Sequence, residues 1–220
     1  MTEQVLALVA HPDDESLGVG ATLARHVREG DSVAVVCFAD GLASRGGVTA
    51  ANIAKRHGMC RSACKTIGTD DVYLHQFADN MMDNVALIEV VRYIERHIER
   101  VKPTIVYTHW RSDLNVDHRV LHDAANVACR PMPGQTVRKL LYFEVPCSSR
   151  WGQGFEPNYF VPVTEADMRV KFAACECYAE EMRQFPHPRS MLGIEALAKL
   201  RGASVGFEWA EAFVVGRVIA

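Results

Sequence analysis

The sequence predicts a single α/β domain in which a Rossmann-like, mostly parallel sheet is flanked by helices. Three observations support this fold class. Short, continuously apolar runs alternate with longer segments whose apolar residues recur at helical spacing. Polar clusters follow two of these runs, and in open α/β sheets ligands bind at the carboxyl ends of the strands. The length of 220 residues fits one domain, and no linker, repeat or low-complexity segment divides it.

The first half of the chain predicts four strand and helix pairs. The run from Val5 to Ala10 is short and apolar, which is typical of a strand buried on both faces of a parallel sheet. The helix after it ends at Gly30, a residue suited to the left-handed C-cap conformation. The expected elements are strand 5–10, helix 16–28, strand 32–38, helix 49–67 closed by Gly68, strand 72–74, helix 85–101 broken by Lys102-Pro103, strand 104–108 and helix 117–129.

After Pro131 the pattern changes, and we expect a C-terminal elaboration of the same domain. Two further strands, one long helix and a final strand are predicted there. The expected elements are strands 140–145 and 159–163, a helix from 165 to about 185, and strand 212–218.

Composition excludes several classes of protein. The net charge of -3 and the pI near 6.3 argue against nucleic-acid binding, which needs concentrated positive charge. The first apolar run is far shorter than the ~20 residues of a membrane span and has no basic leader, so a cytoplasmic protein is expected. Seven cysteines without a CxxC pair indicate reduced, mostly buried thiols. Homo-oligomerisation is left open.

A dense polar cluster, His11-Pro12-Asp13-Asp14-Glu15, follows the first predicted strand. Neighbouring carboxylates repel one another, so a cation that gathers them is a simple explanation. Imidazole nitrogen with carboxylate oxygen suits zinc, and a catalytic zinc needs a third protein ligand. The polar segment 109–118 after the fourth strand ends in His118, and strand ends of a parallel sheet meet at one edge. We therefore expect these two clusters to share a metal site.

Two other interpretations are open, one of the acidic cluster and one of where a metal would bind. The acidic residues could simply complement the dipole of the following helix, with His11 as an ordinary loop residue. Cys175 and Cys177 could bind a metal instead, although positions i and i+2 of a helix face different sides.

The segment Ala10-His11-Pro12-Asp13-Asp14-Glu15 resembles the signature of the PIG-L (LmbE-like) N-acetylglucosaminyl deacetylase family. The resemblance runs through most of the chain. It includes Asp40-Gly41 after the second strand, Arg56 before Ile67-Gly68, Asp79 after the third strand, and Asp117-His118.

The resemblance implies a set of roles. His11, Asp14 and His118 would hold Zn²⁺, or another divalent metal such as Fe²⁺, and Asp13 would be the general base. Glu15 would support the ligand residues or be structural. The candidates for substrate binding are Arg56, Asp79, Asp113 and Arg189. Without the resemblance, Arg56 would be a cation on a helix surface and Asp79 a loop cap.

Two positions depart from the family pattern. Asn115 stands where many members have an auxiliary His, and Met59 where many have Glu. The general acid is therefore open between Asp13, His109 and His187, while the amide of Asn115 could hydrogen-bond the substrate or the oxyanion. Pro186-His187-Pro188 could also be only a stiff loop.

The function implied is hydrolysis of the acetamide of an N-acetylated amino sugar, either free or linked to a nucleotide, lipid or glycan. The segments 108–118 and 182–190 resemble a bacterial subgroup associated with surface polysaccharides. The alternatives are a metal amidase of the same fold that acts on a non-sugar amide, and a metal-binding module without turnover.

Overall fold

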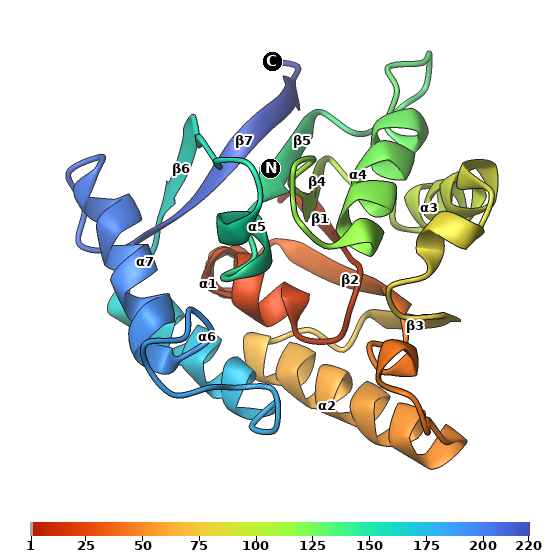
Figure 1. Cartoon of the computed structure of the whole chain (residues 1–220). Helices are drawn as coiled ribbons and strands as arrows, with labels where there is room; N and C mark the ends of the chain where they lie inside the picture. Colours follow the sequence, from red (N-terminus) through yellow and green to blue (C-terminus); the bar gives the residue numbers. More distant parts are fainter. Residues whose placement is uncertain (1) are drawn as a thin grey trace.

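The computed structural model describes residues 2–220. They form one seven-stranded sheet with helices on both faces, in the strand order β3-β2-β1-β4-β5-β7-β6 (Figure 1). The strands are β1 Gln4–Val9, β2 Ser32–Ala39, β3 Val72–Phe77, β4 Ile105–His109, β5 Lys139–Phe143, β6 Tyr159–Pro162 and β7 Ala210–Val218. The helices are α1 Asp14–Glu29, α2 Ala50–Ile67, α3 Leu87–Val101, α4 Val116–Ala128, α5 Ser148–Trp151, α6 Glu165–Glu176 and α7 Met191–Ala203, with short 3-10 turns at Ala43–Arg45 and Met82–Asn84.

The predicted fold class is confirmed. Strands β1 to β5 pair in parallel, whereas β7 is antiparallel to both β5 and β6. The antiparallel pair and the helices around it are the C-terminal elaboration that the sequence predicts.

Strand β1 is the centre of the fold and is buried on both faces. Its alternate side chains enter two different cores, Val5 on the side of α1 and α2 and Leu6 on the side of α3 and α4. Helix α6 packs on α1 and α2, and α3 packs on α4. A strand covered on both faces needs an unbroken apolar run, which is the pattern seen in the sequence.

Two helix ends form as predicted. Gly30 and Gly68 follow α1 and α2 with φ angles of 89° and 110°, and their amides bond back to the last carbonyls of each helix. A glycine adopts this left-handed conformation without steric cost. Both glycines turn the chain back toward the next strand.

The strand order reverses between β1 and β4, which is the topological switch point of the sheet. In open α/β sheets a crevice forms there at the carboxyl ends of the strands. The backbone N–H of Ala10, after β1, donates to Nε2 of His109 at the end of β4, at 2.9 Å. The two polar clusters therefore meet, as the sequence predicts.

The C-terminal helices differ from the prediction. The helix expected from 165 to about 185 ends at Glu176. Beyond Glu176 the backbone changes to tighter turns, because the amides of Cys177 and Tyr178 donate hydrogen bonds to carbonyls three residues back. Helix α7 was not predicted, although Ser190 caps it by accepting from the amide of Gly193 at 3.0 Å.

A buried ion pair ties this elaboration to α1. Lys171 of α6 and Glu211 of β7 contact each other, and Lys171 also donates to the carbonyl of Leu17 at 2.8 Å. The carboxylate of Glu211 accepts from the amides of Ala21 and Thr22 inside α1. The C-terminal part thus helps to fix the helix whose first turn carries the polar cluster.

Six of the seven cysteines are buried, one is partly exposed, and all are free, as predicted. Among residues 2–220, none of the helices combines the length and the apolar composition that crossing a membrane requires.

Candidate active site

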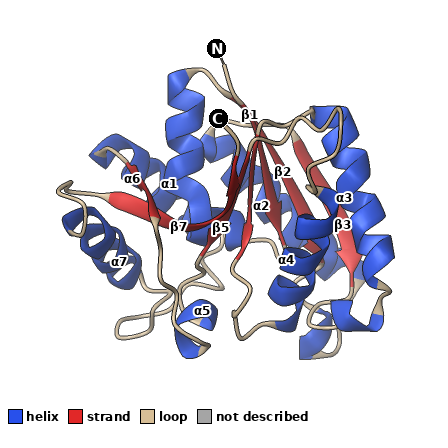
Figure 2. Cartoon of the chain, turned by 90° about the horizontal axis from the view of Figure 1, so that it is seen from above, coloured by secondary structure: helices blue, strands red, loops and turns tan. Residues whose placement is uncertain are grey.

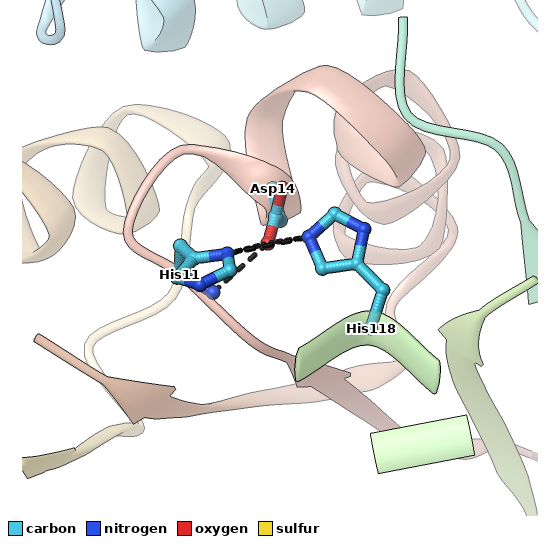
Figure 3. A group of neighbouring side chains, drawn as sticks. All are labelled: His11, Asp14 and His118. Atoms are coloured by element: carbon cyan, nitrogen blue, oxygen red, sulfur yellow. Dashed lines mark hydrogen bonds and ion pairs between the residues drawn. The ribbon is translucent and has the colours of Figure 1, made fainter. Parts of the chain in front are cut away.

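Three side chains from the two clusters form a triangle of nitrogen and oxygen atoms (Figure 3). Nδ1 of His11 lies 3.2 Å from Nε2 of His118 and 3.3 Å from Oδ2 of Asp14. Nε2 of His118 lies 3.2 Å from the same oxygen of Asp14. All three residues are buried.

The size of this triangle fits a tetrahedral metal ion. An ion with bonds of about 2.0 to 2.1 Å at tetrahedral angles holds its ligand atoms about 3.3 Å apart. The second oxygen of Asp14 is buried and has no hydrogen-bond partner. Buried polar atoms are rarely left alone, so the cluster fits a cation that the three residues would hold together.

Carboxylates on the far sides of the two imidazoles orient them. Nε2 of His11 lies 3.1 Å from Asp79 and 3.0 Å from Asp117, and Nδ1 of His118 lies 3.1 Å from Asp113. In a neutral ring, a neighbouring carboxylate favours the proton on the nitrogen that faces it, so the lone pairs of both rings face the triangle. This is the usual arrangement around histidine ligands of metals.

The same carboxylates raise the pKa of both rings. Burial disfavours the charged imidazole of His11, but hydrogen bonds that the ring donates to the surrounding carboxylates, that to Asp117 first, outweigh it and hold its pKa well above the usual value. Burial also opposes charging of His118, yet the charge of Asp14 and the hydrogen bond of Asp113 raise its pKa to about 9. Both nitrogens therefore attract a cation, whether proton or metal.

Asp117 belongs to this site although it was not among the predicted site residues. Its two oxygens accept from the backbone amides of Asn80 at 2.7 Å and Met82 at 2.9 Å. Ser44 donates to Asp79 from the loop after β2. In the sequence Asp117 stands beside His118, but this position gave no indication that the carboxylate of Asp117 reaches His11.

Asp13 lies at the N-cap of α1 with a φ angle of 123°, a conformation that costs a non-glycine residue about 1 to 3 kcal/mol. Two guanidinium groups bind its Oδ2, that of Arg56 at 2.9 Å and that of Arg189 at 3.2 Å. Its amide donates to Glu15 at 3.1 Å. The backbone is thus held in a strained form directly before the triangle.

Arg56 is not a surface cation, so that interpretation is wrong. Its side chain is 5% exposed, and it donates to the carbonyl of Pro12 at 2.5 Å as well as to Asp13. Glu181 pairs with its other terminal nitrogen at 3.4 Å, and the ring of Tyr178 lies beneath it. These contacts indicate that Arg56 positions the loop of Asp13.

His109 lies behind the triangle and is fully buried. Its ring stacks on His118 with centroids 3.8 Å apart, and its Nε2 accepts the N–H of Ala10. Burial and the neighbouring charge of His118 hold the pKa of His109 well below the usual value. An Nε2 that accepts a backbone proton has none of its own to donate, so these contacts favour a structural role.

Asn115 and Asp113 also bond within the protein. The side-chain oxygen of Asn115 caps α4 by accepting from the amide of Asp117 at 2.8 Å, and its nitrogen donates to Asn80 at 2.9 Å. The carboxylate of Asp113, beside its contact with His118, accepts from Ser148 at 3.0 Å and from Ser149.

His187 and Arg189 lie in the segment between α6 and α7, and Arg189 reaches the site through its contact with Asp13. Nδ1 of His187 accepts the backbone N–H of Arg189 at 3.0 Å, which places the proton of the neutral ring on Nε2. Besides Asp13, the guanidinium of Arg189 contacts Sγ of Cys147 at 3.3 Å. The ring of His187 meets that of Trp151 edge to face, with centroids 5.8 Å apart.

Glu15 points away from the triangle into the core. Its carboxylate accepts from Tyr178 and from Ser16, each at 2.7 Å. Burial raises its pKa to about 7 although these hydrogen bonds oppose the shift. The contacts agree with the structural role expected for it. Cys175 and Cys177 belong to no group of described side chains that could hold a metal.

Comparisons with known proteins agree with this architecture. The model of the PIG-L family, described as GlcNAc-PI de-N-acetylase, matches residues 6–129. The uncharacterized deacetylase YaiS of Escherichia coli K12 is 34% identical over 175 residues, which are 77% of this chain and 87% of that protein.

Solved structures share the fold at lower identity. The N,N'-diacetylchitobiose deacetylase of Pyrococcus horikoshii superposes with a TM-score of 0.78 at 19% identity, covering 97% of this chain and 83% of that one. GalB, the 4-carboxy-2-hydroxymuconate hydratase of Pseudomonas putida KT2440, does so with a TM-score of 0.76 at 20% identity, covering 100% and 98%.

A fold shared by a deacetylase and a hydratase does not by itself decide the reaction. The family match carries more weight, because it spans more than half of the chain and includes every residue of the triangle. Together with the relative from Escherichia coli, it shows that this chain belongs to the PIG-L family of deacetylases.

Proposed function

We propose that this protein is a zinc-dependent deacetylase that hydrolyses the acetamide of an N-acetylated amino sugar. His11, Asp14 and His118 would hold the metal, and Asp13 would be the general base. The observation that carries the proposal is the triangle of ligand atoms with 3.2 to 3.3 Å sides, next to a carboxylate held by two arginines.

A bound zinc ion would supply Lewis-acid stabilisation of the developing oxyanion and would make water acidic enough to react near neutral pH. The protein's own residues do the rest. Asp79 and Asp117 keep His11 in the tautomer whose lone pair faces the site, and Asp113 does the same for His118. Fe²⁺ could occupy the same nitrogen and oxygen ligands.

We assign to Asp13 the proton of the attacking water. Arg56 and Arg189 both contact Oδ2 of its carboxylate, which supports a fixed orientation of the group. A positioned base of this kind contributes ~10² to 10⁴ to the rate. Breakdown of the tetrahedral species then needs a proton for the leaving amine.

His187 is the stronger histidine candidate for that proton, and Asp13 is the alternative. Nδ1 of His187 accepts from the amide of Arg189, which leaves Nε2 as the nitrogen available for proton exchange, and Arg189 in turn touches Asp13. His109 is buried with its Nε2 already engaged. We assign substrate contacts first to Arg189, and we infer positioning roles for Arg56, Asp79, Asp113 and Asn115.

The test is acetate release from a panel of N-acetylated amides by protein loaded with known metals. The panel contains N-acetylglucosamine, its disaccharide, its nucleotide-linked form, and non-sugar N-acetyl amides. We expect hydrolysis of sugars, loss on chelation, and recovery with zinc. Hydrolysis of non-sugar amides alone would make the protein a metal amidase, and stoichiometric metal without any hydrolysis would make it a binding module.

Asp13→Asn sharpens this test. The amide keeps the shape of the side chain but cannot accept the proton of water, so we expect a ~10² to 10⁴-fold lower rate with metal content unchanged. Asp31→Asn, on the loop between α1 and β2, is the control for removing a carboxylate elsewhere. Loss of metal from Asp13→Asn would mean that Asp13 is a ligand.

A further inference from the structure

Trp151 is a large aromatic side chain that the folded chain leaves 59% exposed. Tryptophan is highly buried on average, so an exposed one at the edge of a polar site suggests a recognition surface. Its ring lies nearly perpendicular to that of His187, at 87° with centroids 5.8 Å apart.

Helix α5, which carries Trp151, lies on the side toward which the parallel strands point (Figure 2). Two sets of contacts join it to the site. Ser148 and Ser149 donate to Asp113, the carboxylate behind His118. On the other side, Cys147, directly before α5, contacts Arg189, whose guanidinium binds Asp13.

The backbone around α5 is also fixed. The amide of Leu114 donates to the carbonyl of Ser148 at 3.2 Å, and the amide of Val145 donates to Oγ of Ser149 at 2.8 Å. Gly152 follows so tightly that an added Cβ would lie 2.5 Å from the carbonyl oxygen of Ser112. The indole is therefore presented from a rigid support, which lowers the entropy lost on binding.

The occupant that this arrangement fits is a sugar ring. One face of a pyranose carries C–H groups, whose partial positive charge is attracted by the negative face of an aromatic ring. Trp151 contacts His187, whose Nδ1 accepts from the amide of Arg189, and Arg189 in turn binds Asp13, so the indole lies beside the reacting centre and not within it. A ring stacked on it would be the neighbour of the sugar that loses acetate.

We propose that Trp151 is a stacking platform for the pyranose ring next to the N-acetylated sugar, which makes a di- or oligosaccharide the preferred substrate. This inference rests on the proposed function, because it takes the reacting group to be a sugar acetamide. Trp151 is then a specificity-determining residue and takes no part in proton transfer.

The test compares N-acetylglucosamine with its β-linked disaccharide in wild type, Trp151→Ala and Trp151→Phe. We expect Trp151→Ala to lower kcat/KM for the disaccharide about tenfold, mainly through KM, and to change the value for the monosaccharide less than about twofold. Trp151→Phe should restore most of the difference. Met132→Ala, which removes a similarly exposed side chain from the loop before β5, should change neither value.

Equal losses on both substrates, or no loss on either, would overturn the inference while leaving the proposed function in place. Binding gives a separate readout, since the disaccharide should quench or shift the fluorescence of Trp151. Trp209 is buried and Trp110 partly so, and Trp151→Phe should lose the change. If wild type hydrolyses neither sugar, the proposed function fails, and the fluorescence change alone then decides whether the platform stands.

Discussion

The two parts of this chain contribute to the site in different ways. The part matched by the family model, residues 6–129, supplies His11, Asp14 and His118 from the tips of two central strands. The later part supplies side chains from turns and a short helix, among them Arg189 and Trp151. The first set is buried and contacted by carboxylates, whereas Arg189 is 22% exposed. Metal binding and the general base should therefore depend on the first part, and substrate choice on the second.

The largest expected effect comes from removing a ligand in the first part. His118→Ala leaves two ligands of three, so metal content and hydrolysis should both fall to background, as measured by elemental analysis and acetate release. His122→Gln, one turn along the same helix, is the control and should keep both. Retention of one equivalent of metal by His118→Ala would contradict the assignment of metal binding to the first part of the chain.

The next effect concerns proton donation from the second part. If His187 protonates the leaving amine, His187→Gln should lower the maximal rate by ~10² with metal retained. His109→Gln should instead lower stability, because this side chain is fully buried in contact with His118. An unchanged maximal rate for His187→Gln would assign both proton steps to Asp13.

The two arginines on Asp13 allow a direct comparison of the two parts. Arg189→Gln should lower the rate about tenfold with little change in the free energy of unfolding, because the side chain is partly solvated. Arg56→Gln removes a buried charge from Asp13 and Glu181, and we expect it to lower that free energy by about 3 to 5 kcal/mol. Urea unfolding and kinetics measure both. An equal loss of unfolding free energy in Arg56→Gln and Arg189→Gln would contradict this difference between the two parts of the chain.

The smallest expected effect is the release of protons when zinc binds. The carboxylates raise the pKa of His11 well above its usual value and that of His118 to about 9, so protons compete with a metal for the two ligand nitrogens. Zinc binding should then release protons, and its affinity should fall as the pH falls. Calorimetry in buffers of different ionisation enthalpy measures the number. Binding without proton release would show that the lone pairs are already free.

The sequence predicted the first part of the molecule better than the second for a physical reason. A strand such as β1, buried on both faces, must be apolar throughout, and the polar cluster after it must lie at the sheet edge. The helix after Glu165 was predicted too long because apolar spacing continues past Glu176, whereas the backbone changes there to tighter turns. Helix α7 was missed although Ser190 marks its start.

Within the site, residue types were predictable but their partners were not. The ligand triangle follows from two strand tips that parallel pairing brings together. The contact of Arg189 with Asp13 depends on how the turns after α6 pack, and no local pattern encodes it. Asp117 was passed over for the same reason, since its contact with His11 joins residues 106 positions apart.

The guanidinium of Arg189 touches the two residues that flank the site in left-handed conformations, Asp13 at φ 123° and Cys147 at φ 88°. Its contact with Asp13 joins positions 176 residues apart. During synthesis, His11, Asp14 and His118 are therefore all part of the chain long before Arg189 is added and this contact can form. The order of translation therefore separates the metal ligands from the arginine that orients Asp13. A nascent chain contains the residues that would hold a cation before it contains the residue that completes the setting of the general base.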